Sequence, residues 1–280
     1  MNFGLIIIGD EILSGKRVDQ HLPKVIALLS ARGLSLSWAH YVGDNPERIT
    51  AELRAAFAGG DAVFSCGGIG ATPDDHTRRC AAAALGRPLV LHPQACELIM
   101  ARVRQMAAEQ GWSADPDHPD TQRRLAMGVF PEGAEIIANP YNKIPGFSIG
   151  EVHFVPGFPV MAHPMIESLL DTRYAHWHRR HAWQERSVIV LGSMEATLTP
   201  LMEAIEARFP GVKVFSLPSV DHPQWGRHIE LGVKGEPALV DVAYAELLAG
   251  LRGHSVKLGP ELVRSTGGDD ANIVHQAAPS

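Results

Sequence analysis

Two short apolar runs in this chain each lead directly into a segment rich in glycine and carboxylates. Leu5-Ile6-Ile7-Ile8 precedes Gly9-Asp10-Glu11, and Ala62-Val63-Phe64 precedes a loop with Gly67, Gly68 and Gly70. A short, continuous apolar run with this kind of ending is typical of a buried strand in a parallel sheet. Since ligands bind outside the carboxyl ends of such strands, we expect both segments at one ligand site.

The second junction predicts the seat of a phosphate or another anion. Three glycines leave the backbone open, and the following Thr72-Pro73-Asp74-Asp75 is typical of a helix start with free N–H groups. Asp74 and Asp75 would repel a phosphate unless a divalent cation lay between them. A plainer alternative is that Thr72, Asp74 and Asp75 only cap a helix that begins at Pro73.

Hydrophobic periodicity predicts helices and strands in alternation, and therefore an α/β fold with three layers around a doubly wound, mostly parallel sheet. Asn45 followed by Pro46 predicts one helix start, and Gly33, Gly60 and Gly86 predict helix ends. The first helix is expected to bury Leu22, Val25, Ile26 and Leu29, and three further helices are expected at 46–59, 77–85 and 93–110. Strands are expected at 34–42, 62–64, 135–138 and 152–155.

The pattern changes after residue 171, which predicts a second domain. Residues 172–186 carry several histidines, tryptophans and arginines and are expected to form an exposed helical linker. Residues 187–252 show a β-α-β-β-α pattern typical of a small α+β domain. Residues 253–280 have few apolar side chains, so a disordered tail is expected there.

Charge and composition disfavour nucleic acid and membranes as partners of this protein. The net charge of −6 and the lack of a long Lys/Arg run disfavour nucleic acid as a partner. Three cysteines without metal-ligand spacing indicate a reduced, cytoplasmic protein, in which Cys66 is a packed thiol rather than a nucleophile. No targeting segment or membrane-spanning run is visible, so no membrane partner is expected.

Five motifs in order over residues 1–170 resemble the molybdopterin-binding domain family, in particular the N-terminal region of competence/damage-inducible CinA proteins and, more distantly, the MoaB and MogA proteins. The motifs are 9–15, 42–44, 67–77, Asn139-Pro140 with 145–147, and 156–159. Residues 187–251 are similar to the small middle domain of CinA proteins. Two departures are Ala71, where the family usually has proline, and Asp19-Gln20-His21, where it often has Asp-Thr-Asn.

The resemblance implies a pocket that hydrolyses the pyrophosphate of ADP-ribose-like or FAD-like compounds with a divalent cation, Co²⁺, Mg²⁺ or Mn²⁺, together with potassium. It implies Asp44 and Asp75 as acidic site residues, with Asp74 as an alternative to Asp75 for orienting the attacking water. For the metal, Asp75 is the first candidate, and Asp10 and Glu11 are further ones. The expected phosphate and ligand contacts are Gly67, Gly68, Gly70, Thr72, Gly9, Lys143, Pro156 and Gly157.

Other interpretations remain open at this point. His76 could act as a base or only flank the site, and Glu11 could be structural. The MogA-like branch implies molybdopterin binding or its adenylylation, and a third alternative is a pterin or nucleotide carrier without turnover. The resemblance also implies a homo-oligomer. The sequence ends where a CinA protein would begin its nicotinamide-nucleotide deamidase domain, so we expect that activity to be absent.

Overall fold

The computed structural model describes residues 1–178, 184–254 and 256–265. Contacts divide the chain into two compact units, the first with residues 1–30 and 34–178, and the second with residues 31–33 and the chain from residue 179 onward. No helix in the described part of the chain has the length and apolar character needed to cross a bilayer.

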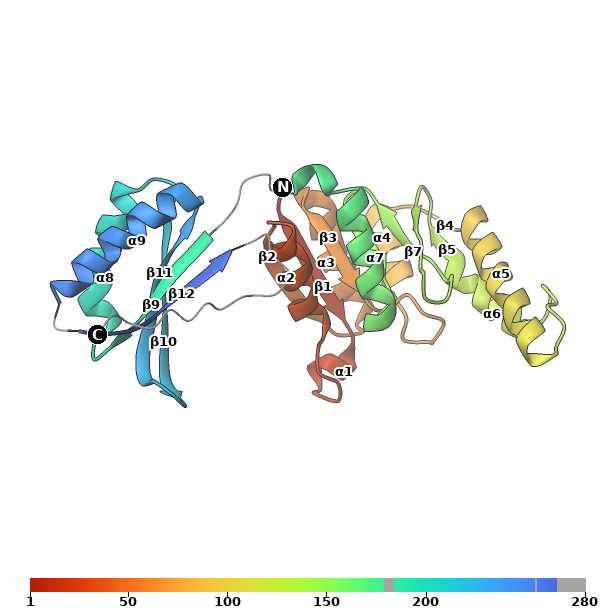
Figure 1. Cartoon of the computed structure of the whole chain (residues 1–280). Helices are drawn as coiled ribbons and strands as arrows, with labels where there is room; N and C mark the ends of the chain where they lie inside the picture. The colour runs from red at the N-terminus through yellow and green to blue at the C-terminus, as the bar shows by residue number, and fades with distance from the viewer. Residues whose placement is uncertain (179–183, 255, 266–280) are drawn as a thin grey trace. The chain divides into compact units, whose positions relative to one another are not determined.

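The first unit is built on a six-stranded sheet with the order β2-β1-β3-β8-β7-β6 (Figure 1). Neighbouring strands from β2 to β8 run parallel, and β7 is antiparallel to both β8 and β6. The prediction of an α/β fold with a mostly parallel sheet is therefore confirmed. The strands are β1 (Phe3–Ile8), β2 (Leu36–Val42), β3 (Ala62–Cys66), β6 (Glu135–Ile137), β7 (Gly146–Ile149) and β8 (Val152–Val155).

Helices cover both faces of this sheet, which completes the three predicted layers. Ile6 and Ile8 of β1 pack with α3 and α4, whereas Leu5 and Ile7 pack with α2 and α7. A strand buried on both faces needs apolar residues at every position, which explains the unbroken run in β1. The helices are α1 (Asp10–Leu13), α2 (His21–Ala31), α3 (Pro46–Gly59), α4 (Thr77–Leu85) and α7 (Pro159–Thr172).

Local helix signals in the sequence are largely confirmed. The Asn45 side chain accepts a hydrogen bond from the Arg48 amide and caps α3, and Gly60 and Gly86 end their helices in the left-handed conformation. In α2, Leu28 is buried and Ile26 is exposed. The prediction had placed Ile26 on the buried face of this helix and had left Leu28 out.

An insertion extends from the first unit beside α4 (Figure 1). Strands β4 (Leu89–Leu91) and β5 (Val129–Pro131) pair antiparallel at its base. Between them lie α5 (Pro93–Gln110), α6 (Pro119–Leu125) and the short η1 (Ala126–Gly128). Helix α5 has the predicted bounds, whereas α6, β4, β5 and β7 were not predicted.

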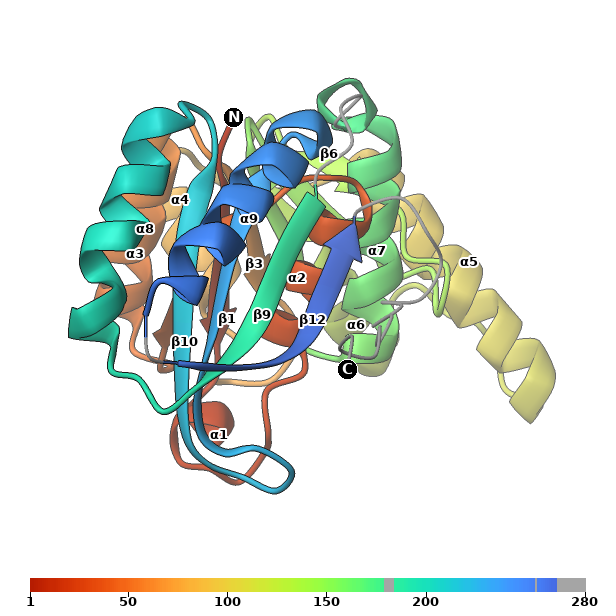
Figure 2. The same cartoon turned by 60° about the vertical axis from the view of Figure 1, so that its left-hand side comes forward.

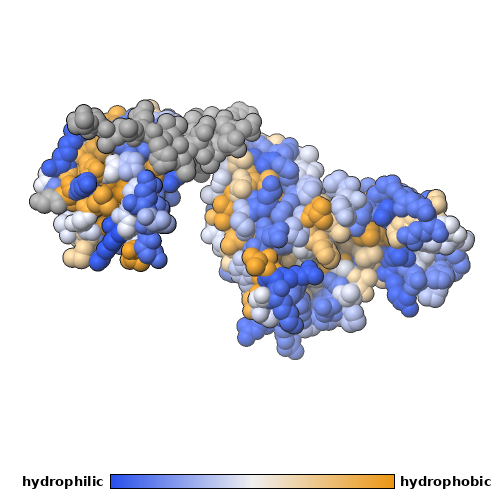
Figure 3. Space-filling view, turned by 60° about the horizontal axis from the view of Figure 1, so that its bottom comes forward, coloured by the Kyte–Doolittle hydropathy of each residue, from blue (hydrophilic) through white to orange (hydrophobic). Residues whose placement is uncertain are grey.

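The second unit has an antiparallel sheet with the order β10-β11-β9-β12. Helices α8 and α9 pack on one face of it, and Figure 2 shows α9 across these strands. Its elements are β9 (Gln184–Leu191), α8 (Glu195–Arg208), β10 (Lys213–His222), β11 (Gly226–Gly235), α9 (Pro237–Arg252) and β12 (Lys257–Ser265). Figure 3 draws a face on which hydrophobic side chains of this unit lie among hydrophilic ones.

Two expectations around this unit were wrong. The supposed tail contains β12, which pairs with β9 and whose Arg264 guanidinium lies 2.6 Å from carboxylates of Glu185 and Glu230. Among the described residues of the expected helical linker, 174 and 178 are not helical, η2 covers only Ala175–Trp177, and the last residues belong to β9, which starts at Gln184. Residues 179–183 and 266–280, which include His181 and the rest of the tail, lie outside the described residues.

Candidate functional site

The loops after β1, β2, β3 and β8 line one pocket of about 530 Å³. These strands are parallel, so their carboxyl ends meet at one edge of the sheet, as expected for a ligand site. Most of the predicted site residues line this pocket: Gly9, Glu11, Asp44, Gly67, Gly68, Gly70, Thr72, Asp74, Asp75, Pro156 and Gly157. Asp10 and Lys143 are not among the lining residues.

The glycine loop after β3 needs glycine because neighbouring atoms leave no room for a side chain. Gly67 has φ +107°, and a Cβ there would lie 2.3 Å from the carbonyl oxygen of Ile8. The Thr77 hydroxyl donates to the Gly67 carbonyl at 3.0 Å, and Arg78 donates to the carbonyls of Ile69 and Gly70, both at 2.7 Å. Helix α4 therefore holds the loop through its carbonyl groups.

Several amide groups of this loop remain available. Within the described residues, the main-chain amides of Gly68, Ile69 and Ala71 donate no hydrogen bond. Unpaired amides in a glycine-rich loop can bind anionic oxygens. The loop thus retains donors for a phosphate after its own carbonyls have been anchored.

Asp75 organises the turn inside this loop. Its carboxylate accepts hydrogen bonds from the Gly70 amide at 2.9 Å, the Thr72 amide at 2.8 Å and the Thr72 hydroxyl at 2.5 Å. Helix α4 spans Thr77–Leu85, which confirms the predicted span 77–85, and the alternative start at Thr72 and Pro73 is not observed; His76 occupies the N-cap position. The reason is that an aspartate can bond to nearby backbone amides and stabilise a turn instead of a helix.

Asp10 and Asp44 connect the loops after β1 and β2. The Asp10 amide donates to the Asp44 carboxylate at 2.9 Å, and the Asp44 amide donates to the Asp10 carboxylate at 3.1 Å. Only Asp44 of the two lines the pocket. Burial raises the pKa of Asp44, and the charges of Asp10, Glu11 and Asp74 raise it further, against the effect of the Asp10 amide.

Arg17 is a cation of this pocket that the sequence analysis missed. It lines the pocket, its main-chain amide donates to the Glu11 carbonyl at 3.0 Å, and its guanidinium carbon lies 5.9 Å from the centre of the Phe158 ring. No ion pair joins it to a carboxylate among the described residues. Its place two residues beyond the Gly9–Gly15 motif is the only signal that could have identified it.

Three other candidate residues, Lys143, His76 and Cys66, are not among the residues that line the pocket. Lys143 is exposed, with φ +66°, and its amide donates to the Asn139 carbonyl at 3.0 Å. His76 occupies the N-cap position of α4 without a side-chain capping hydrogen bond, and it is not among the pocket-lining residues. Cys66 is buried, and burial raises the pKa of its thiol, which favours the packed-thiol interpretation over a nucleophile.

The carboxylates do not form a complete metal cage. Within the described part of the chain, no group of three or more His, Cys, Asp or Glu side chains is arranged to hold a metal ion. Magnesium and similar cations are commonly held by one or two carboxylates together with substrate phosphates. Asp44 and Glu11, which line the pocket beside the glycine loop, fit that kind of site.

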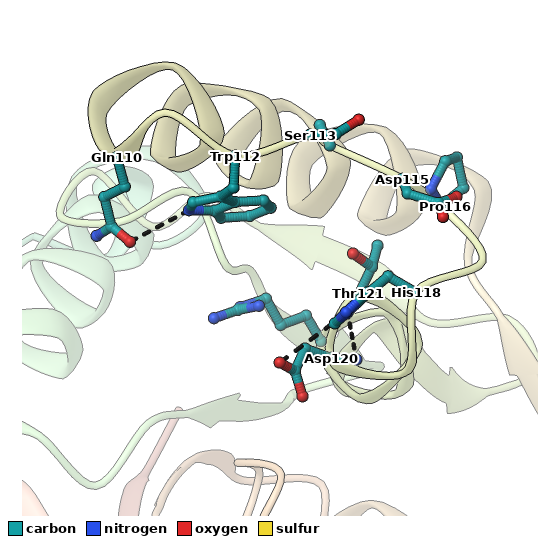
Figure 4. A pocket seen from close by; sticks show the side chains of 10 residues that line it. Gln110, Trp112, Ser113, Asp115, Pro116, His118, Asp120 and Thr121 are labelled. Carbon is teal, nitrogen blue, oxygen red and sulfur yellow. Dashed lines mark hydrogen bonds and ion pairs between the residues drawn. The ribbon is translucent and has the colours of Figure 1, made fainter.

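A separate pocket of about 790 Å³ lies in the insertion formed by α5 and α6 (Figure 4). Its lining includes Trp112, whose indole N–H donates to the Gln110 side chain at 3.2 Å, and His118, which accepts from the Asp120 amide at 3.2 Å. None of the predicted site residues lines it. We therefore assign the candidate site to the sheet edge and not to this larger pocket.

Comparison with known proteins gives the family. The family model described as a probable molybdopterin binding domain matches residues 4–176. The chain belongs to this family. All predicted site residues lie within the matched molybdopterin-binding domain, which coincides with the first compact unit over most of its length.

Relatives of this molybdopterin-binding domain protein include CinA-like proteins. A CinA-like protein of Syntrophotalea carbinolica is 28% identical over 223 residues, which cover 75% of this chain and 51% of that protein. A protein of Pyrobaculum calidifontis is 32% identical over 236 residues, 80% of this chain and 85% of that protein. The chain thus spans about half the length of the CinA-like relative.

A solved structure supports the same relationship. The crystal structure of CinA from Thermoplasma acidophilum, a protein described as having unknown function, matches with a TM-score of 0.50 and 26% identity. The match covers 61% of this chain and 98% of that chain. The sequence-based resemblance to CinA-like proteins is therefore confirmed.

Proposed function

We propose that this protein is a metal-dependent hydrolase of nucleotide diphosphates of the ADP-ribose or FAD type. The observation that carries the proposal is one pocket in which unpaired glycine-loop amides, the unpaired Arg17 guanidinium and the Asp44 carboxylate lie together. This combination suits a pyrophosphate, because the amides and Arg17 can bind its oxygens while a cation offsets the acidic residues.

Asp44 and Glu11 are the residues that would hold a divalent cation, with Asp74 as a further carboxylate of the same pocket. Burial and neighbouring negative charges both raise the pKa of Asp44, and a cation would relieve both effects. When bound, a divalent cation supplies Lewis-acid chemistry at a phosphoryl oxygen. Asp75 holds the loop in shape through its three hydrogen bonds and acts as a positioning residue.

The proposed reaction is attack of water on one phosphorus of the pyrophosphate. A bond forms from the water oxygen to that phosphorus, the bond to the bridging oxygen breaks, and the other phosphate leaves with the bridging oxygen. Asp74, an exposed residue of the pocket lining, would take the water proton, and Arg17 would offset the charge of the leaving phosphate. For ADP-ribose, the products are AMP and ribose 5-phosphate.

A second candidate function uses the same pocket. The family description favours binding of a molybdopterin, which also joins a phosphate to a flat heterocycle, with or without its adenylylation. A carrier of a pterin or nucleotide would need the unpaired amides of the glycine loop and the Arg17 guanidinium, but it would need no cation at Asp44. Metal-dependent release of AMP from a dinucleotide therefore separates the hydrolase from both forms of this alternative.

Product analysis tests the proposed hydrolysis. Purified protein is incubated with ADP-ribose, FAD or NAD in Co²⁺, Mg²⁺ or Mn²⁺ with potassium, and AMP is measured by chromatography. We expect AMP from the wild type, loss of it in Asp44→Asn, and retention in Asp120→Asn, a matched change in the other pocket. Absence of AMP with every substrate and metal would overturn the hydrolase, and tight binding of intact ligand would then favour a carrier.

A further inference from the structure

A smaller chamber of about 250 Å³ adjoins the main pocket. The two share the lining residues Ile8, Glu11, Arg17 and Gly157. Pockets for whole drug-sized ligands are usually larger, roughly 300–1,000 Å³, so the chamber suits one part of a ligand whose remainder lies in the main pocket.

The walls of the chamber suit a neutral, flat group. Apart from the shared Glu11 and Arg17, its lining is aliphatic or neutral and includes Ile7, Ile12 and Val18. A second phosphate would find no further cation there, whereas a heterocyclic ring can pack against aliphatic side chains. The chamber and the main pocket therefore differ in the chemistry that they accept.

His21 provides a fixed polar group in this chamber. Its side chain is buried, with 4% of the residue exposed, and its Nε2 lies 3.0 Å from the Gly157 carbonyl oxygen. A carbonyl oxygen only accepts hydrogen bonds, so Nε2 carries the proton and donates it. In a neutral imidazole the other nitrogen, Nδ1, is then an acceptor.

The Nδ1 atom of His21 has no hydrogen-bond partner among the described residues, although it is buried. Burial lowers the pKa of His21, which keeps the ring neutral and Nδ1 unprotonated. A buried polar atom without a partner is unfavourable by itself, and a ligand that supplies a hydrogen bond recovers this loss.

We propose that the chamber holds the heterocycle of the bound nucleotide and that His21 is a specificity-determining residue whose Nδ1 accepts a hydrogen bond from an amino group of that ring. This inference rests on the proposed function, because it assigns the phosphates to the main pocket. The ligand class is a nucleotide with an exocyclic amino group on the base, as in adenine.

His163 gives an alternative occupant for this acceptor. Its ring centre lies 5.3 Å from that of His21, and its Nε2 is also buried without a partner among the described residues. A water molecule bridging the two imidazoles would satisfy both nitrogens without any ligand. Since His163 does not line the chamber, its substitution is a matched control.

Calorimetric binding of two mononucleotides tests the inference without requiring turnover. The probes are AMP and purine riboside 5′-monophosphate, which differ only in the amino group on the ring. We expect the wild type to bind AMP about 5-fold to 10-fold more tightly, the range for one hydrogen bond. Equal affinity for the two probes, or no binding of AMP, would overturn the inference.

Three variants then locate the effect. His21→Gln can still donate to the Gly157 carbonyl but lacks an acceptor at the Nδ1 position, so its preference for AMP should vanish. His21→Asn places an amide near that position and should keep part of the preference, and His163→Gln should keep all of it. A preference that persists in His21→Gln, or that disappears in His163→Gln as a bridging water predicts, would contradict the assignment.

These outcomes are separable from the proposed hydrolysis. A protein that prefers AMP through His21 but releases no product from ADP-ribose would refute the hydrolase and leave the base chamber intact. If His21→Gln does not fold, as judged by circular dichroism, the comparison of the two probes on the wild type, His21→Asn and His163→Gln still decides.

Discussion

Asp10 and Asp44 hold each other by two hydrogen bonds, each from the amide of one residue to the carboxylate of the other, at 2.9 and 3.1 Å. The pair joins the loops after β1 and β2, which are adjacent parallel strands. The Asp44 carboxylate is thereby fixed at the wall of the pocket, whereas the exposed Asp10 is not among the lining residues. A cation at Asp44 would thus bind to a carboxylate whose position the fold already determines.

Asp44→Asn should make the protein more stable at pH 7 while removing its response to metal. The pKa of Asp44 is raised in the folded state, so the folded protein binds this proton more tightly, and stability falls as pH rises through that pKa. The amide keeps an acceptor for Asp10 without the charge. Thermal unfolding from pH 3 to 7 should show an advantage of the variant that disappears below about pH 3.9.

The metal response gives the second half of this test. Millimolar Mg²⁺ or Mn²⁺ should raise the melting temperature of the wild type and have little effect on Asp44→Asn, because a ligand stabilises only the state that binds it. An equal rise in both proteins would place the cation elsewhere.

Asp75→Ala should destabilise the protein even without metal or substrate. Loss of the carboxylate leaves the amides of Gly70 and Thr72 without their acceptor, at a cost of about 1–3 kcal/mol in the free energy of unfolding. Urea unfolding measures this value. The exposed neighbour Asp74, changed to Asn, is the control and should change stability much less, because the hydrogen bond with Thr72 that lowers the pKa of Asp74 is exposed to solvent. A fully stable Asp75→Ala would mean that Asp75 does not organise the loop.

Gly67→Ala should disrupt both stability and ligand binding. The new Cβ would meet the Ile8 carbonyl oxygen at 2.3 Å in a left-handed backbone conformation, which should lower the free energy of unfolding by about 2–5 kcal/mol. Gly86→Ala is the control for backbone strain, because Gly86 also has a positive φ but no atom lies within 4 Å of its Cβ position. Similar losses in both variants would exclude the steric explanation.

Arg17→Ala should weaken AMP binding by about 10-fold to 100-fold, because the unpaired guanidinium is the cation that lines the pocket. Stability should be unchanged, since this side chain is exposed and makes no ion pair among the described residues. Titration calorimetry gives the affinity, and Lys16→Ala is the control for loss of one positive charge nearby. An equal effect of both variants would indicate only long-range attraction.

The first unit should lose stability between pH 6.5 and 3 through His153. Burial lowers the pKa of His153 to about 3, so the folded state resists the proton that the unfolded chain accepts near its usual value of 6.5. Stability from this group is complete above pH 6.5 and falls with pH by up to about 1.4 kcal/mol per unit. Urea unfolding at pH 7 and 5 should show a smaller difference in His153→Gln, and an unchanged difference would exclude His153 as its source.

The sequence predicted those parts of the protein whose signals are local. The apolar runs of β1 and β3 need no partner to be recognised as buried strands, and Asn45-Pro46 specifies the start of α3 through its own capping bond. Because parallel strands end at one edge of a sheet, these local signals also predicted which loops would meet. The pocket at that edge joins eleven of the predicted residues.

Tertiary structure alone decided what each side chain does there. Asp75 is adjacent to Asp74 in sequence, yet its carboxylate bonds to the loop whereas Asp74 is exposed, because the direction of each side chain depends on the turn. Arg17 reaches the pocket and Lys143 does not, which no local pattern distinguishes. Strand β12 was missed for the same reason: its nine residues become a strand by pairing with β9, more than sixty residues earlier. Such long-range hydrogen bonds and contacts, which local sequence does not encode, determine the roles of individual residues in this site.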